Sequence, residues 1–215
     1  MNPPATAEID WRVYVIVDPD RLHPDRTLEE TTRAACRGGA GVIQLRDKEG
    51  TDRQRLARAR RLKVVCRTHG ARFVVNDRLD IALAAEADGL HLGPDDLPIV
   101  DARRVAPDLL IGGSAGTVER AVELQKAGAD YLGCGAVYDA APSKPDASDP
   151  RGPERIAEIV DAVDIPVVGI GGITPDNAPP VLAAGAAGVA VIRAVVAQAD
   201  PESATRHLHA RSLSG

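Results

Sequence analysis

The sequence predicts an α/β protein that forms a single (β/α)8 barrel of the TIM type. Eight short apolar stretches alternate with eight helix-favouring stretches, and this regular alternation is typical of parallel strands joined by helices. The chain has 215 residues, which is enough for one domain with a full core and lies near the lower end of the usual barrel size. A doubly wound open sheet is the alternative, but eight near-equal units favour the closed barrel. We expect residues 1–10 to be a disordered lead-in and residues 11–215 to form the single barrel domain.

The expected strands are short, mostly apolar and rich in β-branched residues, as parallel strands covered on both faces should be. Five of them are followed directly by Asp, Asn or Gly, which are typical of turns, and the other three by Ser114, Ala136 and Arg193. Pro166 fits this pattern because a strand tolerates proline at its start. The eight strands are expected at residues 11–17, 41–46, 73–75, 89–92, 109–113, 129–135, 165–170 and 188–192.

The expected helices are marked by their ends and by an apolar stripe. Gly38 and Gly39 end the first helix in the manner of a C-cap, and Pro153 stands at the favoured first position of the sixth. The long second helix carries six Arg and Lys residues away from its apolar stripe, which we interpret as a solvated outer face. The eight helices are expected at residues 27–37, 51–69, 81–85, 100–105, 117–126, 153–163, 174–184 and 201–211.

Composition excludes several classes of function. The formal net charge of −5 argues against a general nucleic-acid-binding protein. Residues 1–10 are polar and lack the apolar run of a signal peptide, and no apolar segment is long enough to span a bilayer. Three cysteines without paired spacing make a disulfide framework improbable. We therefore expect a soluble cytoplasmic protein with no nucleic-acid or membrane partner, while the pattern does not decide whether it forms a homo-oligomer.

Two carboxylates follow neighbouring strands and predict a metal site. Asp77 comes directly after the third expected strand, and Asp96 follows the fourth. Because both ends of a parallel βαβ unit open on one edge of the sheet, the two side chains should lie close together. With a phosphate-bearing substrate this pair suits Mg²⁺, which takes one or two carboxylates and fills its other positions with water and phosphate oxygens. The alternative that both residues are helix N-caps stays open.

Other strand ends carry groups that bind anions. Gly171 and Gly172 precede an expected helix, and with the turn after the last strand they stand where barrels commonly hold a phosphate. Arg46, Lys48 and Lys144 are too many cations for one monophosphate, and they suggest a second and more highly charged anion bound with the metal. The site therefore calls for two anionic small-molecule substrates. The polar or cationic residues at the rim, besides the two carboxylates, are Gln44, Arg46, Lys48, Asn76, Ser114, Lys144 and Arg193.

These residues form motifs that closely resemble the thiamine phosphate synthase family, in that family's order, over residues 13–200. The matching motifs are Gln44-Leu-Arg46-Asp-Lys48, Asn76-Asp77, His91-Leu-Gly-Pro-Asp95-Asp96, Ser143-Lys144-Pro-Asp-Ala147 and Gly169-Ile-Gly171-Gly172-Ile173-Thr174. A set of this kind is far more specific than a single glycine motif. The resemblance implies a transferase that condenses hydroxymethylpyrimidine diphosphate with a thiazole phosphate and releases pyrophosphate, with Mg²⁺ as cofactor.

The resemblance also implies a role for each matching position. The metal ligands would be Asp77 and Asp96. The contacts to the pyrimidine diphosphate would be Gln44, Arg46, Lys48, Asn76, Ser114 and Lys144, of which the catalytic cations are Arg46, Lys48 and Lys144. The contacts to the thiazole phosphate would be Ala141, Ser143, Gly172, Ile192 and Arg193.

The chain departs from the family pattern at a few positions, and two rival functions remain. Ala141 and Ser143 stand where the family has threonines, and Arg193 stands where serine is common. We hypothesise that Arg193 contacts the thiazole phosphate and partly replaces the missing hydroxyl. His91 is either a general acid or, more often for a strand residue, a hydrogen-bonded core histidine. The rivals are a thiazole tautomerase, which needs no diphosphate or metal, and a catalytically silent barrel that binds a phosphorylated ligand.

Overall fold

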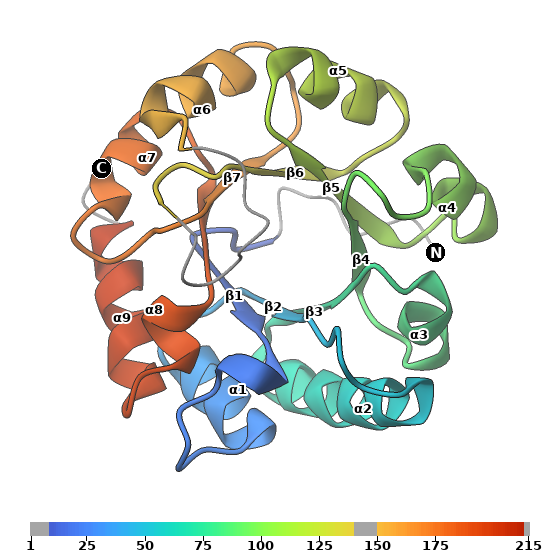
Figure 1. Cartoon of the computed structure of the whole chain (residues 1–215), viewed down its shortest axis with the longest axis vertical. Coiled ribbons are helices and arrows are strands. Elements are labelled where there is room, and N and C mark those ends of the chain that lie inside the picture. The colour runs from blue at the N-terminus through green and yellow to red at the C-terminus, as the bar shows by residue number, and fades with distance from the viewer. Residues whose placement is uncertain (1–8, 140–149, 213–215) are drawn as a thin grey trace.

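Eight parallel strands close into one barrel in the order of the chain, so the predicted fold class is confirmed (Figure 1). The computed structural model describes residues 9–139 and 150–212. Each strand pairs with its sequence neighbours, and β8 pairs with β1 to complete the ring. The strands are β1 (Val13–Val17), β2 (Val42–Leu45), β3 (Arg72–Asn76), β4 (Gly89–Leu92), β5 (Leu110–Ala115), β6 (Tyr131–Cys134), β7 (Val167–Ile170) and β8 (Gly188–Val191).

Helices surround the barrel and follow the predicted order. Two of them begin with a capping box, in which a threonine and the residue three positions later exchange hydrogen bonds: Thr27 with Glu30, and Thr51 with Gln54. The helices are α1 (Leu28–Arg37), α2 (Asp52–His69), α3 (Leu79–Ala84), α4 (Ile99–Val105), α5 (Val118–Lys126), α6 (Gly152–Val160), α7 (Ala178–Ala183), α8 (Arg193–Val196) and α9 (Pro201–Arg211), with a 3-10 turn η2 (Pro19–Arg21) after β1.

The structure corrects the predicted start of α7 and adds two short elements. A helix was expected from residue 174, but α7 begins at Ala178. The preceding residues form a turn in which the Asn177 side-chain oxygen accepts from the Thr174 N–H at 2.7 Å and thereby closes the turn on itself. The short α8 and the 3-10 turn were not predicted, because four and three residues are too few to show a helical period.

β5 extends two residues beyond its predicted end. A strand was expected to stop at residue 113 with Ser114 beyond it, but the pairing of Ser114 with Gly133 and of Ala115 with Cys134 continues the ladder between β5 and β6. Ser114 is therefore a strand residue and not a loop residue. This places its side chain within hydrogen-bonding distance of a side chain on β4.

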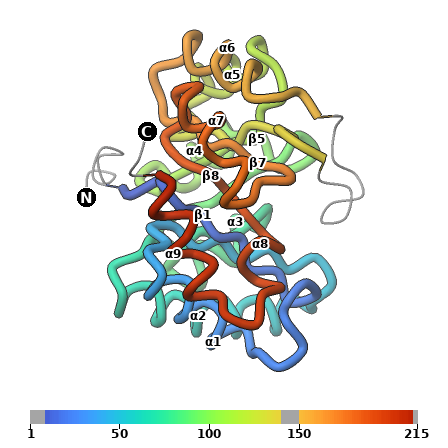
Figure 2. Tube along the Cα trace, turned by 90° about the vertical axis from the view of Figure 1, so that its left-hand side faces the viewer, coloured from blue at the N-terminus to red at the C-terminus, as the bar shows by residue number. Residues whose placement is uncertain are grey.

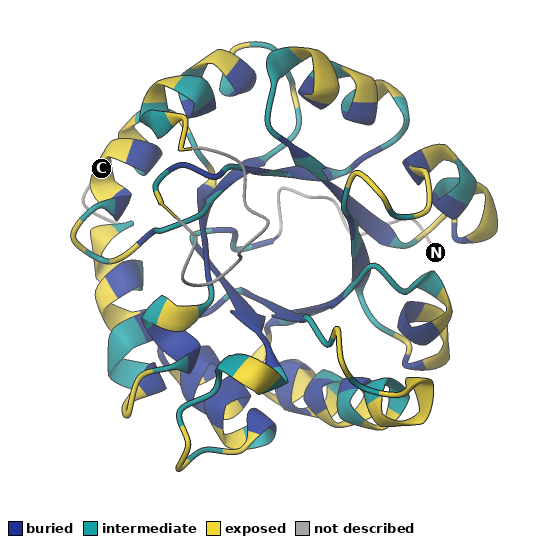
Figure 3. Cartoon of the chain, viewed as in Figure 1, coloured by how far each residue is buried: buried dark blue, intermediate teal, exposed yellow. Residues whose placement is uncertain are grey.

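The core has two layers, one on each side of the strands. Most strand residues are buried, whereas the helices are buried on one face and exposed on the other (Figure 3). The outer layer packs the strands against the helices and includes large buried side chains such as Phe73 and Leu90. The inner layer fills the barrel and contains Trp11, Tyr14 and Tyr131 among aliphatic residues. Side chains therefore fill the interior, and the loops at the ends of the barrel are left to bind ligands.

The first and last described residues lie on the same side of the barrel, where the strands begin (Figure 2). Ile9 is buried there, Asp10 forms an ion pair with Arg12 at 2.6 Å, and the ring of His209 comes within 3.9 Å of Asp10. The placement of a domain boundary at residue 10 stays a prediction. No helix in the described part of the chain is both long enough and apolar enough to cross a membrane.

Candidate active site

The carboxyl ends of the strands form a rim that gathers most of the predicted site residues. Gln44 lies on β2, Asn76 ends β3, and Ser114 lies on β5, while Asp77 and Asp96 follow β3 and β4. The roles of these residues stay predictions, since the structure contains no ligand. Three predicted residues lie outside the described residues: Ala141, Ser143 and Lys144.

The two predicted metal ligands lie side by side on this rim. The carboxyls of Asp77 and Asp96 are close enough to affect each other's protonation, and Lys48 forms an ion pair with Asp77. Burial raises the pKa of Asp96, and the neighbouring carboxyl of Asp77 raises it further. The Gly93 N–H donates to Asp96 at 2.6 Å and fixes its side chain in a turn. A cation between the two carboxylates would relieve their mutual repulsion.

The backbone at Asp77 is unusual and helps to form the pair. Its φ of 64° lies in the left-handed region, which aspartate tolerates better than most residues. The Asp77 N–H donates to the carbonyl of His91 at 2.9 Å, so the turn is attached to β4. Neither Asp77 nor Asp96 is the N-cap of a helix, because α3 begins after Arg78 and α4 after Pro98. The N-cap alternative is therefore wrong for both.

The donor set fits Mg²⁺ bound together with a phosphorylated ligand. Within the described residues, no cluster of three or more His, Cys, Asp or Glu could hold a metal by itself. Two carboxylates are the number that a Mg²⁺ site commonly uses when phosphate oxygens and water complete the octahedron. Asp77 and Asp96 would hold the ion.

Arg46 is held by a buried carboxylate that the sequence did not single out. Its guanidinium donates to Asp18 at 2.7 Å, and the Asp18 side chain is only 3% exposed. The second oxygen of Asp18 accepts from the Asp20 N–H at 3.0 Å, which caps the 3-10 turn after β1. Asp18 thus orients Arg46 from the neighbouring strand. Its place directly after a buried strand was the signal that could have identified it.

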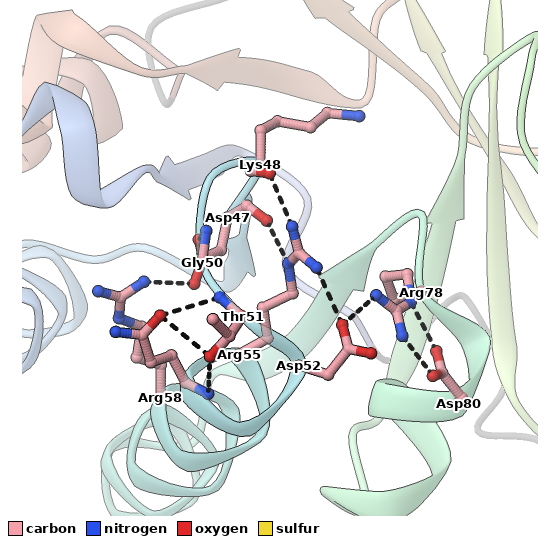
Figure 4. A network of polar contacts seen from close by, with 10 residues as sticks. Asp47, Lys48, Gly50, Thr51, Asp52, Arg55, Arg58, Arg78 and Asp80 are labelled. Carbon is pink, nitrogen blue, oxygen red and sulfur yellow. Dashed lines mark hydrogen bonds and ion pairs between the residues drawn. The ribbon is translucent and has the colours of Figure 1, made fainter.

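An arginine on α2 holds the backbone of the loop that carries Lys48 (Figure 4). Arg55 donates to the carbonyl oxygens of Asp47 at 2.8 Å and of Lys48 at 2.7 Å. Arg58 donates to the Asp47 carboxylate at 2.6 Å. The same carboxylate group accepts from the Gly50 N–H at 2.8 Å. Two basic residues that we interpreted as part of a solvated helix face therefore support the loop next to the carboxylate pair.

Arg78 extends this network to the loop after β3. Its guanidinium donates to Asp52 at 2.6 Å and to both oxygens of Asp80, at 2.9 and 2.5 Å (Figure 4). Hydrogen bonds from Arg78 lower the pKa values of Asp52 and Asp80. The network therefore joins the start of α2 to the residue that directly follows Asp77.

The predicted thiazole phosphate contacts come from a glycine turn and from the residues after β8. Gly172 has a φ of 63°, and a Cβ there would lie 2.4 Å from the Asp139 carbonyl oxygen, so only glycine fits. Asn177 donates to the Gly172 carbonyl at 3.0 Å and fixes the turn. Ile192 precedes α8 and is partly buried, while Arg193 begins it and is exposed.

Inside the barrel, Gln44 and Ser114 are linked through His91 and through two tyrosines that sequence reasoning missed. Gln44 Nε2 donates to the Tyr14 hydroxyl at 2.8 Å, and the Ser114 hydroxyl lies 3.0 Å from His91 Nε2. Tyr131 lies between Tyr14 and His91. In the sequence, Tyr14 and Tyr131 look like ordinary strand residues. The sequence of one strand does not show which side chains of a distant strand its residues will contact. His91 is hydrogen-bonded at both ring nitrogens, and whether it also acts as a general acid stays a prediction.

The family model described as thiamine monophosphate synthase matches residues 13–195. The chain belongs to this family. It is 48% identical over 202 residues to the thiamine-phosphate synthase of Natronomonas pharaonis, covering 93% of this chain and 94% of that one. It is 49% identical over 199 residues to the corresponding enzyme of Moorella thermoacetica, covering 92% and 94%.

Among solved structures, thiamine phosphate pyrophosphorylase from Pyrococcus furiosus superposes with a TM-score of 0.87 at 43% identity, covering 95% of this chain and 96% of that one. Fold, family and relatives agree with the resemblance seen in the motifs. The expectation of a transferase that makes thiamine phosphate is thereby confirmed. The thiazole tautomerase and the silent barrel lose their support, since the curated relatives named here are thiamine-phosphate synthases.

Proposed function

We propose that this member of the thiamine monophosphate synthase family joins 4-amino-5-hydroxymethyl-2-methylpyrimidine diphosphate to a thiazole phosphate, with or without a carboxyl group on the thiazole, by a Mg²⁺-assisted dissociative displacement. The carbon–oxygen bond to the diphosphate breaks first, and the electron-rich pyrimidine stabilises the resulting benzylic-type cation. The thiazole nitrogen then bonds to that carbon, giving thiamine phosphate and free pyrophosphate. A thiazole that carries a carboxyl group would also release it as CO2, and a proton from solvent would take its place. No strong base is needed, which suits a rim without an evident nucleophile–base pair.

The observation that carries the proposal is the adjacent pair Asp77 and Asp96 with Lys48 bonded to it. When bound, Mg²⁺ supplies positive charge to the leaving diphosphate. Arg46 and Lys48 add to that charge from the end of β2 and from the loop after it, and Lys144 is proposed to add to it as well. Preorganised charge of this kind stabilises the transition state without first having to reorganise solvent.

Binding is divided between the two sides of the rim. Gln44, Asn76 and Ser114 are proposed to hold the pyrimidine. Gln44 lies on the strand that leads to Arg46, Asn76 directly precedes Asp77, and Ser114 contacts His91 on the strand that leads to Asp96. The Gly172 turn, Ile192 and Arg193 are proposed to hold the thiazole phosphate, and Ala141 and Ser143 are proposed to contribute to the same contact. Among the described residues, no protein acceptor takes the N–H of Gly172, so this group is available to an anion.

The decisive experiment incubates the purified protein with both substrates, with and without Mg²⁺, and measures thiamine phosphate and pyrophosphate together. We expect equal amounts of the two products in the presence of Mg²⁺ and almost none after chelation. Lys144→Ala should slow single turnover by about a hundredfold, the usual cost of one charge-stabilising donor, with little effect on thiazole phosphate binding. Pyrophosphate formation without thiamine phosphate, or full activity in the presence of a chelator, would contradict the proposal.

A further inference from the structure

A continuous line of hydrogen bonds crosses the inside of the barrel from β2 to β5. It joins the side chains of Gln44, Tyr14, Tyr131, His91 and Ser114, which we call the polar relay. Gln44 Nε2 donates to the Tyr14 hydroxyl at 2.8 Å, and the two tyrosine oxygens lie 2.9 Å apart. The Tyr131 hydroxyl lies 3.1 Å from His91 Nδ1, and His91 Nε2 lies 3.0 Å from the Ser114 hydroxyl. The relay connects two of the residues that are proposed to hold the pyrimidine.

Donor and acceptor chemistry gives the relay a single direction. The amide nitrogen of Gln44 can only donate, so the Tyr14 oxygen accepts from it. Tyr14 is buried, and donation from its hydroxyl to Tyr131 is the order that leaves no buried hydroxyl hydrogen of the relay without an acceptor. The Tyr131 hydrogen then goes to His91 Nδ1, which leaves the proton of the neutral ring on Nε2. That N–H donates to the oxygen of Ser114. Each hydroxyl has one hydrogen, so fixing one end fixes every link.

The two tyrosines keep the hydrogens that this order requires. Both are almost fully buried, and burial raises the pKa of each phenol well above its ordinary value. Tyr131 is also held in place by its surroundings. A Cβ on Gly112 would lie 2.1 Å from its ring, so only a glycine leaves space there, and Trp11 packs against it with ring centroids 4.6 Å apart. A Cβ on Gly133 would likewise approach the His91 ring to 3.1 Å.

The order of protons makes one end of the polar relay a hydrogen-bond acceptor and the other end a donor. The Gln44 oxygen stays an acceptor, and the Ser114 hydrogen stays a donor; within the described residues neither has another protein partner. We propose that Tyr14, Tyr131 and His91 are positioning residues that fix this acceptor–donor pair and thereby select an aminopyrimidine. An aminopyrimidine presents an amino hydrogen beside a ring nitrogen, whereas its 4-oxo analogue presents the reverse, a carbonyl oxygen beside an N–H. This inference rests on the proposed function and extends it to substrate selection.

The proton order can be tested without any substrate, by the nitrogen NMR spectrum of the histidines at about pH 8, where free imidazole is neutral. We expect His91, assigned by its loss in His91→Asn, to show an unprotonated Nδ1 and a protonated Nε2. Tyr14→Phe and Tyr131→Phe should each shift the ring to a mixture of both tautomers. Tyr138→Phe is the matched control, because its hydroxyl donates to the Asn177 carbonyl at 2.9 Å, outside the relay, and should leave the spectrum unchanged. An Nδ1–H tautomer or an even mixture in the wild type would overturn the proposal.

Selection is tested with the 4-amino and 4-oxo forms of 5-hydroxymethyl-2-methylpyrimidine as competitive inhibitors. The wild type should prefer the amino form by roughly a hundredfold or more, because the reversed pattern leaves two buried groups unpaired. In Tyr14→Phe that preference should fall to about tenfold or less, while the KM for the thiazole phosphate changes by less than about twofold. A preference that survives in both tyrosine variants would overturn the role of the relay. If the expected tautomer is found in a protein that makes no thiamine phosphate, the proposed function fails while the proton order stands.

Discussion

The substitution Arg55→Ala should disturb the candidate site, although Arg55 is not among the residues predicted to contact a substrate or Mg²⁺. The Arg55 side chain is 19% exposed and donates to the carbonyl oxygens of Asp47 and Lys48. Arg55→Ala leaves both carbonyls without their donor, so the loop that presents Lys48 should become mobile. Because α2 keeps its capping box and its buried face, we expect the barrel itself to stay folded.

The size of the effect follows from the two lost bonds. A hydrogen bond from a charged donor contributes about 1.5–3 kcal/mol, but water can replace the donor at the freed carbonyls, so the net loss for the loop should be about 2 kcal/mol. The ion pair of Arg55 with the exposed Asp52 adds little to this. If Lys48 must be held in place during the reaction, kcat/KM for the pyrimidine diphosphate should fall roughly thirtyfold.

Kinetics and hydrogen exchange should be measured on the same samples. Amide exchange at residues 47–50 should become faster in Arg55→Ala, with the Gly50 N–H as the most direct reporter because it donates to the Asp47 side chain at 2.8 Å. Arg53→Ala is the control, since Arg53 is an exposed arginine near the start of the same helix. Arg55→Lys should be intermediate, because an ammonium keeps the charge but lacks the planar fork of donors. Wild-type kcat/KM in Arg55→Ala, combined with faster exchange in the loop, would refute the need for a fixed Lys48.

Three further predictions concern other parts of the barrel. Asp96→Ala should abolish Mg²⁺-dependent turnover while circular dichroism stays unchanged, and a full rate at limiting Mg²⁺ would exclude a shared metal site. Arg193→Ser should raise the KM for the thiazole phosphate and spare the pyrimidine diphosphate, because a guanidinium can hold phosphate through two parallel bonds; an unchanged or lower KM would reject that contact. Asp10→Asn should lower the melting temperature at about pH 7 but not at about pH 2. The Arg12 side chain holds the pKa of Asp10 below its ordinary value of 3.8, so this stabilisation is present above that value and disappears as the pH falls through the lowered one. Equal destabilisation at both pH values would rule out the ion pair as the cause.

The fold and the membership of the rim could be predicted because both depend on local pattern. The apolar residues of a strand indicate that it is buried, and a following polar residue such as Asp77 or Asp96 indicates where it ends. Parallel pairing then brings the ends of neighbouring strands together. The contacts between side chains of distant elements could not be predicted in the same way. The pairing of Tyr14 with Tyr131 joins residues 117 positions apart, and it depends on the register and closure of the whole barrel.

Helix ends were harder to predict where a side chain competes with the helix. Thr174 looked like the start of α7, but the side chain of Asn177 takes its N–H and delays the helix by four residues. We predicted that Arg55 and Arg58 would be solvated, because the periodic pattern of a helix shows which of its faces is polar. The pattern does not show which loop folds over that face. Ala141, Ser143 and Lys144 lie outside the described residues, so their roles stay predictions.

The position of Ile9 and α9 on the side where the strands begin has a practical consequence for handling the protein. A surface, bead or reporter domain attached next to these residues would stand behind the barrel and leave the strand ends open to solvent (Figure 2). The ion pair of Asp10 with Arg12 and the nearby ring of His209 give that attachment region a fixed geometry. Immobilised enzyme should therefore receive substrates as freely as enzyme in solution, and two catalysts could be joined through this side without either covering the other's entrance.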